Sequence, residues 1–393
     1  MTRIRLLTAA VLVVGVVAGP SALPAAAPAA PAAPAAVSSA VSAQSPNPAL
    51  EAAIAGLPTA DATAALVRVG GKEGVWRGGS GVHDLRTDRP ADPAARFRAG
   101  SVTKVFTAAV ALRLAEEGLL DLDRTARSYL PDLLPAAYKN VTVRQLLNHT
   151  HGIPPAGFPA TTVEESYEIR FQVHDPRAMV RSATSKPPEF APGERQHYLN
   201  IGYTVAGLLI ERVTGDSYER QVARRVLKPL GLGDTYFPGA NPRIIGPHNH
   251  GYQTMRLDDG TVGLRDVSVW GATDAWAAGD IISTTADLER FTRALFQGRV
   301  VRGPLLEEMF ALPKATDFKT GEPAAYSVGL SMKVLGGREV WGKTGGRWGY
   351  NAAVAATRDG SRTLVYSVNS TDAKGQAMNK VAQDIMVATY GRP

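Results

Sequence analysis

The segment from Ser101 to Leu112 is apolar or small at nearly every position and carries a single charged residue, Lys104. A helix that is hydrophobic on every side is stable only where other parts of the protein cover it. Because Gly118 is the kind of residue that ends a helix, we predict a central buried helix from Ser101 to about Glu117. The fold must surround this helix, and a lone lysine inside it needs a reason.

The chain has 393 residues, of which 45% are hydrophobic and none is cysteine. This length allows two or three folding units, or one large domain with two lobes. The lack of cysteine excludes disulfides, cysteine-ligated zinc, iron–sulfur clusters and a thiol nucleophile, so any chemistry must use oxygen or nitrogen groups. The 43 Lys and Arg residues outnumber the 36 Asp and Glu residues, but they form no dense basic block, and we predict no nucleic-acid partner.

The N-terminal part of the sequence has the composition of an export signal followed by a spacer. Arg3 and Arg5 precede an apolar run over residues 6–19, and Ala-rich positions follow, which is the layout of a secretory signal peptide. The apolar run is too short to span a bilayer. We therefore predict a signal peptide over residues 1–27, an Ala/Pro-rich linker over 28–48, and a secreted protein without a membrane anchor after cleavage.

From residue 49 to residue 393 the sequence alternates between strand and helix patterns. We first predict a helix over 50–57 and strands over 62–69 and 75–83. The predicted middle helices are 143–147, 202–214, 218–227 and 286–296. The predicted last elements are strands over 327–335, 339–341, 350–357 and 363–369, and a helix over 373–390. This order predicts an α+β fold, in which a sheet lobe (about 49–100 and 297–393) is interrupted by a mostly helical lobe (about 101–296).

Ser101 and Lys104 are three positions apart, so both side chains lie on one face of the predicted helix within one turn. At the start of a helix, free backbone N–H groups and the positive end of the dipole stabilise an oxyanion. A desolvated lysine has a lowered pKa and can take a hydroxyl proton, which makes the serine a nucleophile. The alternative is structural, because the pattern is common by chance: Ser101 caps the helix and Lys104 extends to solvent.

Two later segments supply groups that fit such a serine. Gly342-Lys343-Thr344-Gly345-Gly346 lies in a strand-rich region. There, Thr344 and the glycines leave room for a substrate backbone along a strand edge, and Lys343 places a cation near a substrate carboxylate. Tyr198-Leu199-Asn200 precedes a predicted helix. A tyrosine can relay protons with Lys104, and an asparagine can both donate to and accept from a substrate amide.

A Ser-x-x-Lys motif followed by a later Lys-Thr-Gly marks the serine β-lactamases and penicillin-binding proteins. With Tyr198-Leu199-Asn200 between the two, this chain resembles the serine penicillin-recognising hydrolases of the class C β-lactamase and secreted D-alanyl-D-alanine carboxypeptidase type. Within these it is most similar to the exported Streptomyces-type DD-carboxypeptidases. The resemblance runs from about residue 50 to the C-terminus, and the segments that carry it are 97–104, 145–153, 198–209, 228–232, 278–284 and 343–350.

The resemblance implies a β-lactamase/transpeptidase-like fold, with an antiparallel sheet flanked by the N- and C-terminal helices and a mostly helical second lobe. It makes Ser101 the nucleophile and Lys104 and Tyr198 the pair that transfers protons. It also implies that the N–H groups of Ser101 and Gly346 form the oxyanion hole. The substrate-binding residues that it implies are Asn200 for an amide, Lys343 and Thr344 for a carboxylate, and Gly345 and Gly346 beside them. No metal and no cofactor are implied.

By this resemblance the protein is a serine-type D-alanyl-D-alanine carboxypeptidase, which forms an acyl-enzyme with peptidoglycan-type peptides and is also acylated by β-lactams. We expect it to be a monomer. The motifs leave the substrate open, because specificity depends on loops such as residues 152–168 and 267–280. The alternatives are a β-lactamase, an esterase or a D-amino-acid amidase on the same fold, or a wall-binding module that has lost its activity.

The sequence departs from the family pattern beside Lys343. Secreted carboxypeptidases of this type often have histidine at this position, whereas class C β-lactamases have lysine. The carboxypeptidases also tend to have threonine where Gly346 stands, and further cations on the preceding strand, where this chain has Ser331-Met332-Lys333. Lys333 and Arg347 are therefore predicted as possible substitutes for the missing carboxylate ligands.

Other patterns have simpler explanations. Gly337 to Thr344 matches the phosphate-loop pattern, but such a loop must open a helix, and a strand pattern follows. Two histidine pairs, His149/His151 and His248/His250, have no carboxylate clusters nearby in the sequence, so loop hydrogen bonding is favoured over a metal site. No Gly-x-Ser-x-Gly elbow of an α/β-hydrolase is present.

Four large aromatic residues allow two interpretations. They are Phe158, Trp270, Trp276 and Trp348. We favour a place in the core for each, since large aromatic side chains mostly serve burial. The alternative is that they line a pocket.

Overall fold

The computed structural model describes residues 46–375 and 377–392. The chain separates into two units, 1–42 and 43–393, and all the described residues belong to the second. The predicted signal peptide and residues 28–45 of the predicted linker lie outside the described residues. Within residues 46–375 and 377–392, no helix combines the length and the hydropathy that a membrane span requires.

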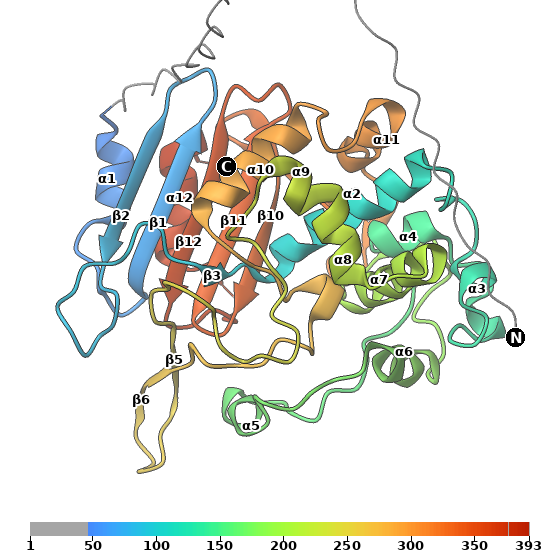
Figure 1. The fold of residues 1–393 in the computed structure, drawn as a ribbon, viewed down its shortest axis with the longest axis horizontal. Coiled ribbons are helices and arrows are strands. Elements are labelled where there is room, and N and C mark those ends of the chain that lie inside the picture. Colours follow the sequence, from blue (N-terminus) through green and yellow to red (C-terminus); the bar gives the residue numbers. More distant parts are fainter. Residues whose placement is uncertain (1–45, 376, 393) are drawn as a thin grey trace, which may run out of the picture. The chain divides into compact units, whose positions relative to one another are not determined.

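The helices and strands follow the order that the sequence predicts (Figure 1). The helices are α1 (Pro48–Ile54), α2 (Thr103–Glu116), α3 (Ala126–Tyr129), α4 (Val143–Leu147), α5 (Val163–Glu168), α6 (Pro176–Thr184), α7 (Ile201–Thr214), α8 (Tyr218–Val222), α9 (Lys228–Leu230), α10 (Thr285–Phe296), α11 (Gly303–Glu307) and α12 (Lys380–Tyr390). The short 3₁₀ turns η1 (Gly100–Val102) and η4 (Trp276–Ala278) matter for the site.

The strands are β1 (Ala62–Gly70), β2 (Trp76–Gly81), β3 (Phe97–Arg98), β4 (Arg195–Gln196), β5 (Tyr252–Arg256), β6 (Val262–Asp266), β7 (Ile282–Ser283), β8 (Thr316–Asp317), β9 (Ser331–Leu335), β10 (Arg338–Arg347), β11 (Tyr350–Thr357) and β12 (Thr363–Ser370). Six of them form one antiparallel sheet in the order β2-β1-β12-β11-β10-β9. Both ends of the described sequence therefore build this sheet.

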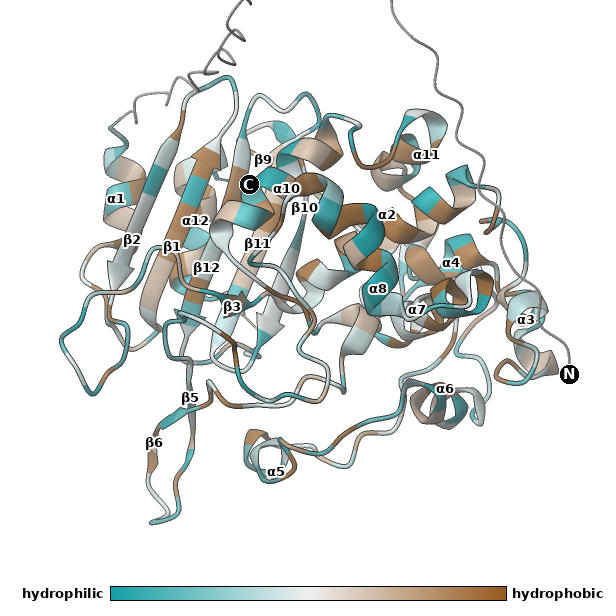
Figure 2. Cartoon of the chain, viewed as in Figure 1, coloured by the Kyte–Doolittle hydropathy of each residue, from teal (hydrophilic) through white to brown (hydrophobic). Residues whose placement is uncertain are grey.

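Helices cover both faces of the sheet. Every residue of β12 is buried, as expected of a strand that is covered on both sides. Leu364 and Tyr366 pack in the cluster formed with α1 and α12, whereas Val365 packs in the cluster formed with α2 and α10. Figure 2 shows the hydrophobic colouring along β1 and β12. The structure confirms the predicted α+β class and the flanking of the sheet by the N- and C-terminal helices.

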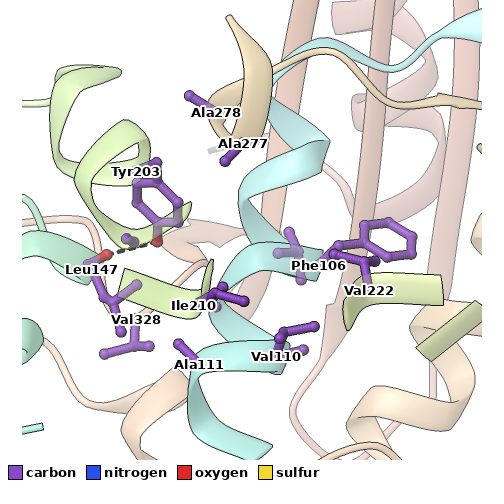
Figure 3. Close-up of a cluster of buried hydrophobic side chains, with 14 of the residues drawn as sticks. Phe106, Val110, Ala111, Leu147, Tyr203, Ile210, Val222, Ala277, Ala278 and Val328 are labelled. Atoms are coloured by element: carbon purple, nitrogen blue, oxygen red, sulfur yellow. Dashed lines mark hydrogen bonds between the residues drawn. The ribbon is translucent and has the colours of Figure 1, made fainter. Parts of the chain in front are cut away.

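The predicted central helix is also confirmed. All residues of α2 from Thr103 to Leu112 are buried, including Lys104. α7, α8 and the turn η4 surround it, and Figure 3 shows Phe106, Val110 and Ala111 among side chains from these elements. On the sheet side, Phe106 stacks on Phe291 of α10, with ring centroids 3.8 Å apart. α10, which the sequence analysis counts with the helical lobe, therefore lies between α2 and the sheet.

Three predicted boundaries are wrong for local reasons. The last helix begins at Lys380 and not at residue 373, because Asn379 caps it by accepting from the Ala382 N–H. The strand predicted from residue 327 begins at Ser331, since Gly329 has a φ of 85° and breaks the extended backbone. The strand predicted over 339–341 extends to Arg347, so the Lys-Thr-Gly segment lies within β10.

Candidate active site

The turn η1, which contains Ser101, is in backbone contact with β10. A Cβ atom on Gly345 would lie 2.0 Å from the Ala99 carbonyl oxygen, and one on Gly100 would lie 2.6 Å from the Gly346 nitrogen. Gly100 also has a φ of 53°, which favours glycine. The glycines at these positions thus allow η1 to approach the strand closely, and Ser101 comes to lie beside Gly345 and Gly346.

Lys104 is held beside Ser101 by two further acceptors. Its Nζ lies 3.2 Å from Ser101 Oγ, and donates to Asn200 Oδ1 and to the Ala278 carbonyl oxygen, each at 2.8 Å. The Asn200 and Ala278 oxygens can only accept hydrogen bonds, so each of them takes one N–H group of Lys104. A neutral amine has two N–H bonds and one lone pair, and the lone pair is then left facing the Ser101 hydroxyl. This geometry fits a lysine that acts as a base toward Ser101.

The surroundings of Lys104 favour the neutral amine. Its side chain is fully buried, and this burial lowers the pKa of Lys104 well below its usual range, with a further decrease from the charges of Lys343 and Lys374. The segment that supplies the Ala278 acceptor is fixed to α2, because Thr107 Oγ1 donates to the Ala277 carbonyl oxygen and Ile281 N donates to Thr103 Oγ1. The snorkelling lysine considered from the sequence is excluded.

Tyr198 lies close to Lys104, whose Nζ is 5.0 Å from the centroid of the Tyr198 ring, and lines the same cavity as Ser101. Its hydroxyl has no hydrogen-bond partner among the described residues, although the Ser101 hydroxyl is close enough to lower its pKa slightly against the larger upward shift caused by burial. The ring is fixed by stacking on Tyr326 at 4.7 Å and by contact with His149 at 4.5 Å between centroids. Because Tyr198 lines the same cavity as Ser101, its unpaired, protonated phenol can donate a proton there.

Asn200 bridges Lys104 and the open cleft. It stands at the N-cap position of α7, and its side chain is exposed apart from the oxygen that accepts from Lys104. Because Oδ1 is turned toward the lysine, the amide NH₂ group is directed to other partners. The arrangement suits a donor to a substrate carbonyl group.

Lys343 has a different environment from Lys104. Its side chain is buried and Nζ donates to the Thr344 carbonyl oxygen at 2.8 Å, while lying over the Tyr198 ring at 4.7 Å. Burial lowers the pKa of Lys343 to about 7. Thr344 is exposed on the strand. The structure thus brings together all of the predicted site residues: Ser101, Lys104, Tyr198, Asn200, Lys343, Thr344, Gly345 and Gly346.

Two cavities meet at these residues. We call the first, of about 370 Å³, the Ser101 cavity, which is lined by Ser101, Tyr198, Tyr326, Asp372 and the stretch Lys343–Gly346, among others. We call the second, of about 450 Å³, the Asn200 cavity, which is lined by Asn200, Arg347, Asp274, the aromatic residues Phe158, Trp270 and Trp348, and others. Lys374 lines both cavities.

The two predicted substitutes for the carboxylate ligands do not serve that role. Arg347 donates to both oxygens of Asp274, at 2.9 and 2.8 Å, so its charge is compensated within the protein. Lys333 stands opposite Val340 in the sheet register, four residues before Thr344, which is roughly 13 Å at the rise of a β-strand. Neither residue is thus a free cation beside Thr344.

The aromatic residues divide between the two interpretations. Phe158, Trp270 and Trp348 line the Asn200 cavity. The pocket interpretation is correct for the exposed Phe158. Trp270 is also buried in a hydrophobic cluster against which Trp348 packs, so the favoured core interpretation is confirmed for Trp270. Trp276 packs beside Tyr218, and its indole N–H donates to Glu219.

The histidine pairs lie apart from one another. His149 is buried against Tyr198, and the His151 Nδ1 accepts from the Ile153 N–H. His250 hydrogen-bonds to Asp266 through Nδ1. Within residues 46–375 and 377–392, no three His, Cys, Asp or Glu side chains are arranged to hold a metal ion.

Three parts of the site have no distinct signal in the sequence. Ala278 contributes only its backbone oxygen to Lys104, so its side chain carries no information. Tyr326 stacks on Tyr198 from a segment without regular structure. Lys374 follows β12 in a segment that we predicted to be helical. Segment 278–284, which is part of the family resemblance, is the one sequence signal near the first of these.

Comparison with known proteins places the chain in a family. A sequence profile described as Beta-lactamase matches residues 50–386. The chain belongs to this family. β-Lactamase family members of this type are serine hydrolases that act through an acyl-enzyme. The finer resemblances to class C β-lactamases and to Streptomyces-type DD-carboxypeptidases stay predictions.

Solved structures share the fold over most of the chain. A D-stereospecific amidohydrolase from Streptomyces sp. is similar with a TM-score of 0.75 and 31% identity, over 88% of this chain and 98% of that one. The D-amino acid amidase of Ochrobactrum anthropi SV3 has a TM-score of 0.74 and 24% identity, over 88% and 97%, which shows the fold alone. The predicted β-lactamase/transpeptidase-like fold is confirmed.

Curated relatives are similar in sequence as well. Penicillin-binding protein 4* of Bacillus subtilis (strain 168) is 28% identical over 326 residues, which are 80% of this chain and 69% of that protein. Esterase EstB of Burkholderia gladioli is 32% identical over 197 residues, which are 47% of this chain and 50% of the esterase. The family thus includes proteins named for different substrates.

Proposed function

We propose that this protein is an exported D-stereospecific amidohydrolase, which cleaves an amide of a D-configured acyl group through an acyl-enzyme on Ser101. The observation that carries the proposal is the arrangement of Lys104, whose lone pair is left facing Ser101 Oγ at 3.2 Å while two oxygens occupy its N–H bonds. The choice of substrate is supported by the likeness to the Streptomyces amidohydrolase over nearly its whole length. Export rests on the composition of residues 1–27.

Acylation uses the two groups that flank the serine. Lys104 takes the proton from Ser101 Oγ as this oxygen attacks the substrate carbonyl carbon, and the carbonyl oxygen becomes an oxyanion beside the N–H groups of Ser101 and Gly346. The Tyr198 hydroxyl gives its proton to the leaving nitrogen, and the C–N bond breaks. The proton on Lys104 then returns to the Tyr198 oxygen, so that the net transfer is from Ser101 to the leaving group.

Deacylation reverses the pattern with water. A water molecule that occupies the position of the departed amine gives a proton to the neutral amine of Lys104 and attacks the acyl carbon; this proton then passes to Oγ as it leaves. The bond to Ser101 Oγ breaks, and Oγ regains a proton. The free acid leaves, and each group returns to its starting state.

The experiment that tests the proposal compares enantiomers. Purified residues 46–393 and a Ser101→Ala variant are given the p-nitroanilides of N-acetyl-D-phenylalanine and N-acetyl-L-phenylalanine, and release of nitroaniline is followed. We expect turnover of the D compound, at least about tenfold slower turnover of the L compound, and none above background with Ser101→Ala. Equal turnover of both enantiomers would contradict D-specificity, and an active Ser101→Ala protein would contradict the mechanism.

The D-alanyl-D-alanine carboxypeptidase predicted from the sequence is the second candidate. Lys343 and Thr344 line the cavity that holds Ser101, and the relative in Bacillus subtilis is named as a penicillin-binding protein. Arg347 favours the first candidate, because its charge is already compensated by Asp274. A lasting Ser101-dependent adduct with benzylpenicillin, together with release of D-alanine from a D-alanyl-D-alanine peptide, would favour the carboxypeptidase.

A further inference from the structure

The two cavities separate the two halves of a substrate. Tyr198 lines the Ser101 cavity, so the leaving nitrogen that receives its proton lies on that side, together with Lys343 and Thr344. Asn200 lines the other cavity, so the acyl half of the substrate lies on its side. This placement rests on the proposed function, because it takes Ser101 as the nucleophile and Tyr198 as the proton donor.

The Asn200 cavity has an excess of positive charge. Its charged lining consists of Arg170, Arg347 and Lys374 on the positive side and Asp274 on the negative side, with His174 nearby. The Arg170 guanidinium donates to the Tyr167 carbonyl oxygen and lies over the Tyr167 ring. Asp274 is thus the single carboxylate among the described residues that line this cavity.

The negative charge of Asp274 is already paired with Arg347 and is not free to bind a substrate. Both of its oxygens accept from Arg347, and the Gly271 carbonyl oxygen accepts from the same guanidinium. Although burial opposes ionisation, Arg347 lowers the pKa of Asp274, and Lys374 lowers it further. A substrate with a free α-ammonium group would therefore enter a cavity whose one anion is already paired, beside three cations.

Lys374 is a cation of this cavity that forms no ion pair with the described residues. It makes no hydrogen bond with the described residues, its Nζ lies 5.8 Å from the centroid of the Trp348 ring, and Asp274 acts on its charge without a direct contact. Its side chain is open to the cleft. Desolvation by the surrounding protein and the charge of Arg347 lower the pKa of Lys374 to about 8, although Asp274 opposes the shift, so Lys374 is mostly charged at neutral pH.

We infer that the acyl half of the substrate is N-acylated and carries an anionic group, such as a carboxylate, which Lys374 binds where the two cavities meet. Three observations point the same way: the excess of cations over carboxylates in the Asn200 cavity, the pairing of Asp274 with Arg347, and the lack of an ion pair at Lys374 among the described residues. A free D-amino acid amide, which is positively charged at its α-amino group, fits this lining poorly. The preferred class is an acidic N-acyl or peptidyl D-amino acid amide.

The test varies only the charge on the acyl half. The substrates are three p-nitroanilides of D-phenylalanine: N-succinyl (anionic), N-acetyl (neutral) and unacylated (cationic). The enzyme is compared with Lys374→Gln, Lys374→Glu and Lys374→Arg. Lys139→Glu, at an exposed position outside both cavities, is the matched control.

We expect kcat/KM to fall from the anionic to the neutral to the cationic substrate. Lys374→Gln should lower kcat/KM about tenfold for the succinyl compound and less than threefold for the acetyl compound. Lys374→Glu should reverse the order of the charged substrates, Lys374→Arg should restore it, and Lys139→Glu should leave it unchanged. A wild-type preference for the free amine, or an order that Lys374→Glu does not move, would overturn the inference.

Failure of the proposed function gives a different result. If no D substrate is cleaved, or if the L compounds are cleaved equally well, the function is wrong while the charge preference is still measurable. For that case, binding of the three compounds to the Ser101→Ala protein is measured by calorimetry. Tighter binding of the succinyl compound that is lost in a Ser101→Ala, Lys374→Glu protein supports the inference, and equal binding of all three overturns it.

Discussion

The two cavities that meet at Lys374 are built in different ways. The Ser101 cavity is formed around η1 and β10, which are in direct backbone contact at Gly100 and Gly345, and part of the segment after β12 completes its lining. The Asn200 cavity is formed largely by the segments around α5, Trp270 and Lys374, which lie between regular elements. The contrast indicates that this fold fixes the reacting groups through its core and leaves selectivity to its connecting segments.

The contacts that hold each cavity differ accordingly. Beside the Ser101 cavity, Lys104 contacts Ser101, is fully buried and is bound to acceptors from two different elements. In the Asn200 cavity, the Phe158 ring is 44% exposed and stacks on His174 at 5.4 Å. We therefore expect changes in the first cavity to affect all substrates alike, and changes in the second to depend on the acyl group.

The largest effect is expected from Lys104→Met. The substitution keeps a side chain of similar length but removes the base for Ser101, so acylation should fall by about 10²–10⁴. The reduction should be the same for small and large acyl groups, because Lys104 does not line the Asn200 cavity. Single-turnover kinetics with N-acetyl-D-alanine and N-acetyl-D-phenylalanine p-nitroanilides measure both points.

Lys139→Met is the control for this substitution, because it removes an exposed lysine far from both cavities. The same folded circular dichroism spectrum in both variants separates loss of the base from loss of structure. An acylation rate within a few-fold of the parent in Lys104→Met would show that another group activates Ser101.

The difference between the cavities explains what the sequence could predict. Ser101 and Lys104 are one helical turn apart, so their contact follows from local geometry and from the apolar residues around them. The contact of η1 with β10 joins residues far apart in the sequence, and we expected it from the family resemblance alone. The glycines at 100 and 345 permit this contact but do not specify the partner.

The lining of the Asn200 cavity was harder to predict. Trp270 and Trp348 are large aromatic residues, and residue type alone does not distinguish a core position from a cavity wall. The loops that carry them have no hydrophobic periodicity that would predict their positions. Arg347 seemed a free cation because its partner, Asp274, is 73 positions away in the sequence. Lys374 was assigned to a helix that begins only after the Asn379 cap. In each case a tertiary contact decides the role.

Deprotonation of Lys343 with rising pH is expected to change substrate preference about tenfold. Since burial lowers its pKa to about 7, Lys343 is charged below this pH and becomes neutral above it. The ratio of kcat/KM for a peptide ending in D-alanyl-D-alanine to that for its C-terminal amide should therefore fall about tenfold between pH 6 and pH 8.5. The ratio cancels the titration of Lys104, which acts on both peptides.

Lys343→Arg separates this effect from other titrating groups, because a guanidinium stays charged throughout this range. Its ratio should be flat over the same pH interval. If the ratio is flat in the parent protein as well, Lys343 does not contact the leaving group, and the carboxypeptidase loses its main support.

The smallest effect is expected from Phe158→Ala in the Asn200 cavity. The side chain is partly exposed, so stability should change little, but the cavity loses one aromatic wall. We expect kcat/KM to fall about threefold to tenfold for N-acetyl-D-phenylalanine p-nitroanilide and less than twofold for the D-alanine compound. Steady-state kinetics on the two substrates give this ratio directly.

Phe171→Ala is a matched control, since Phe171 is 52% exposed on the same segment but does not line the Asn200 cavity. Its ratio between the two substrates should equal that of the parent. An equal loss on both substrates in Phe158→Ala would mean that this segment positions the reacting groups and not the acyl side chain. The separation between a rigid reaction cavity and a selective loop cavity would then fail at Phe158, because one residue would serve both.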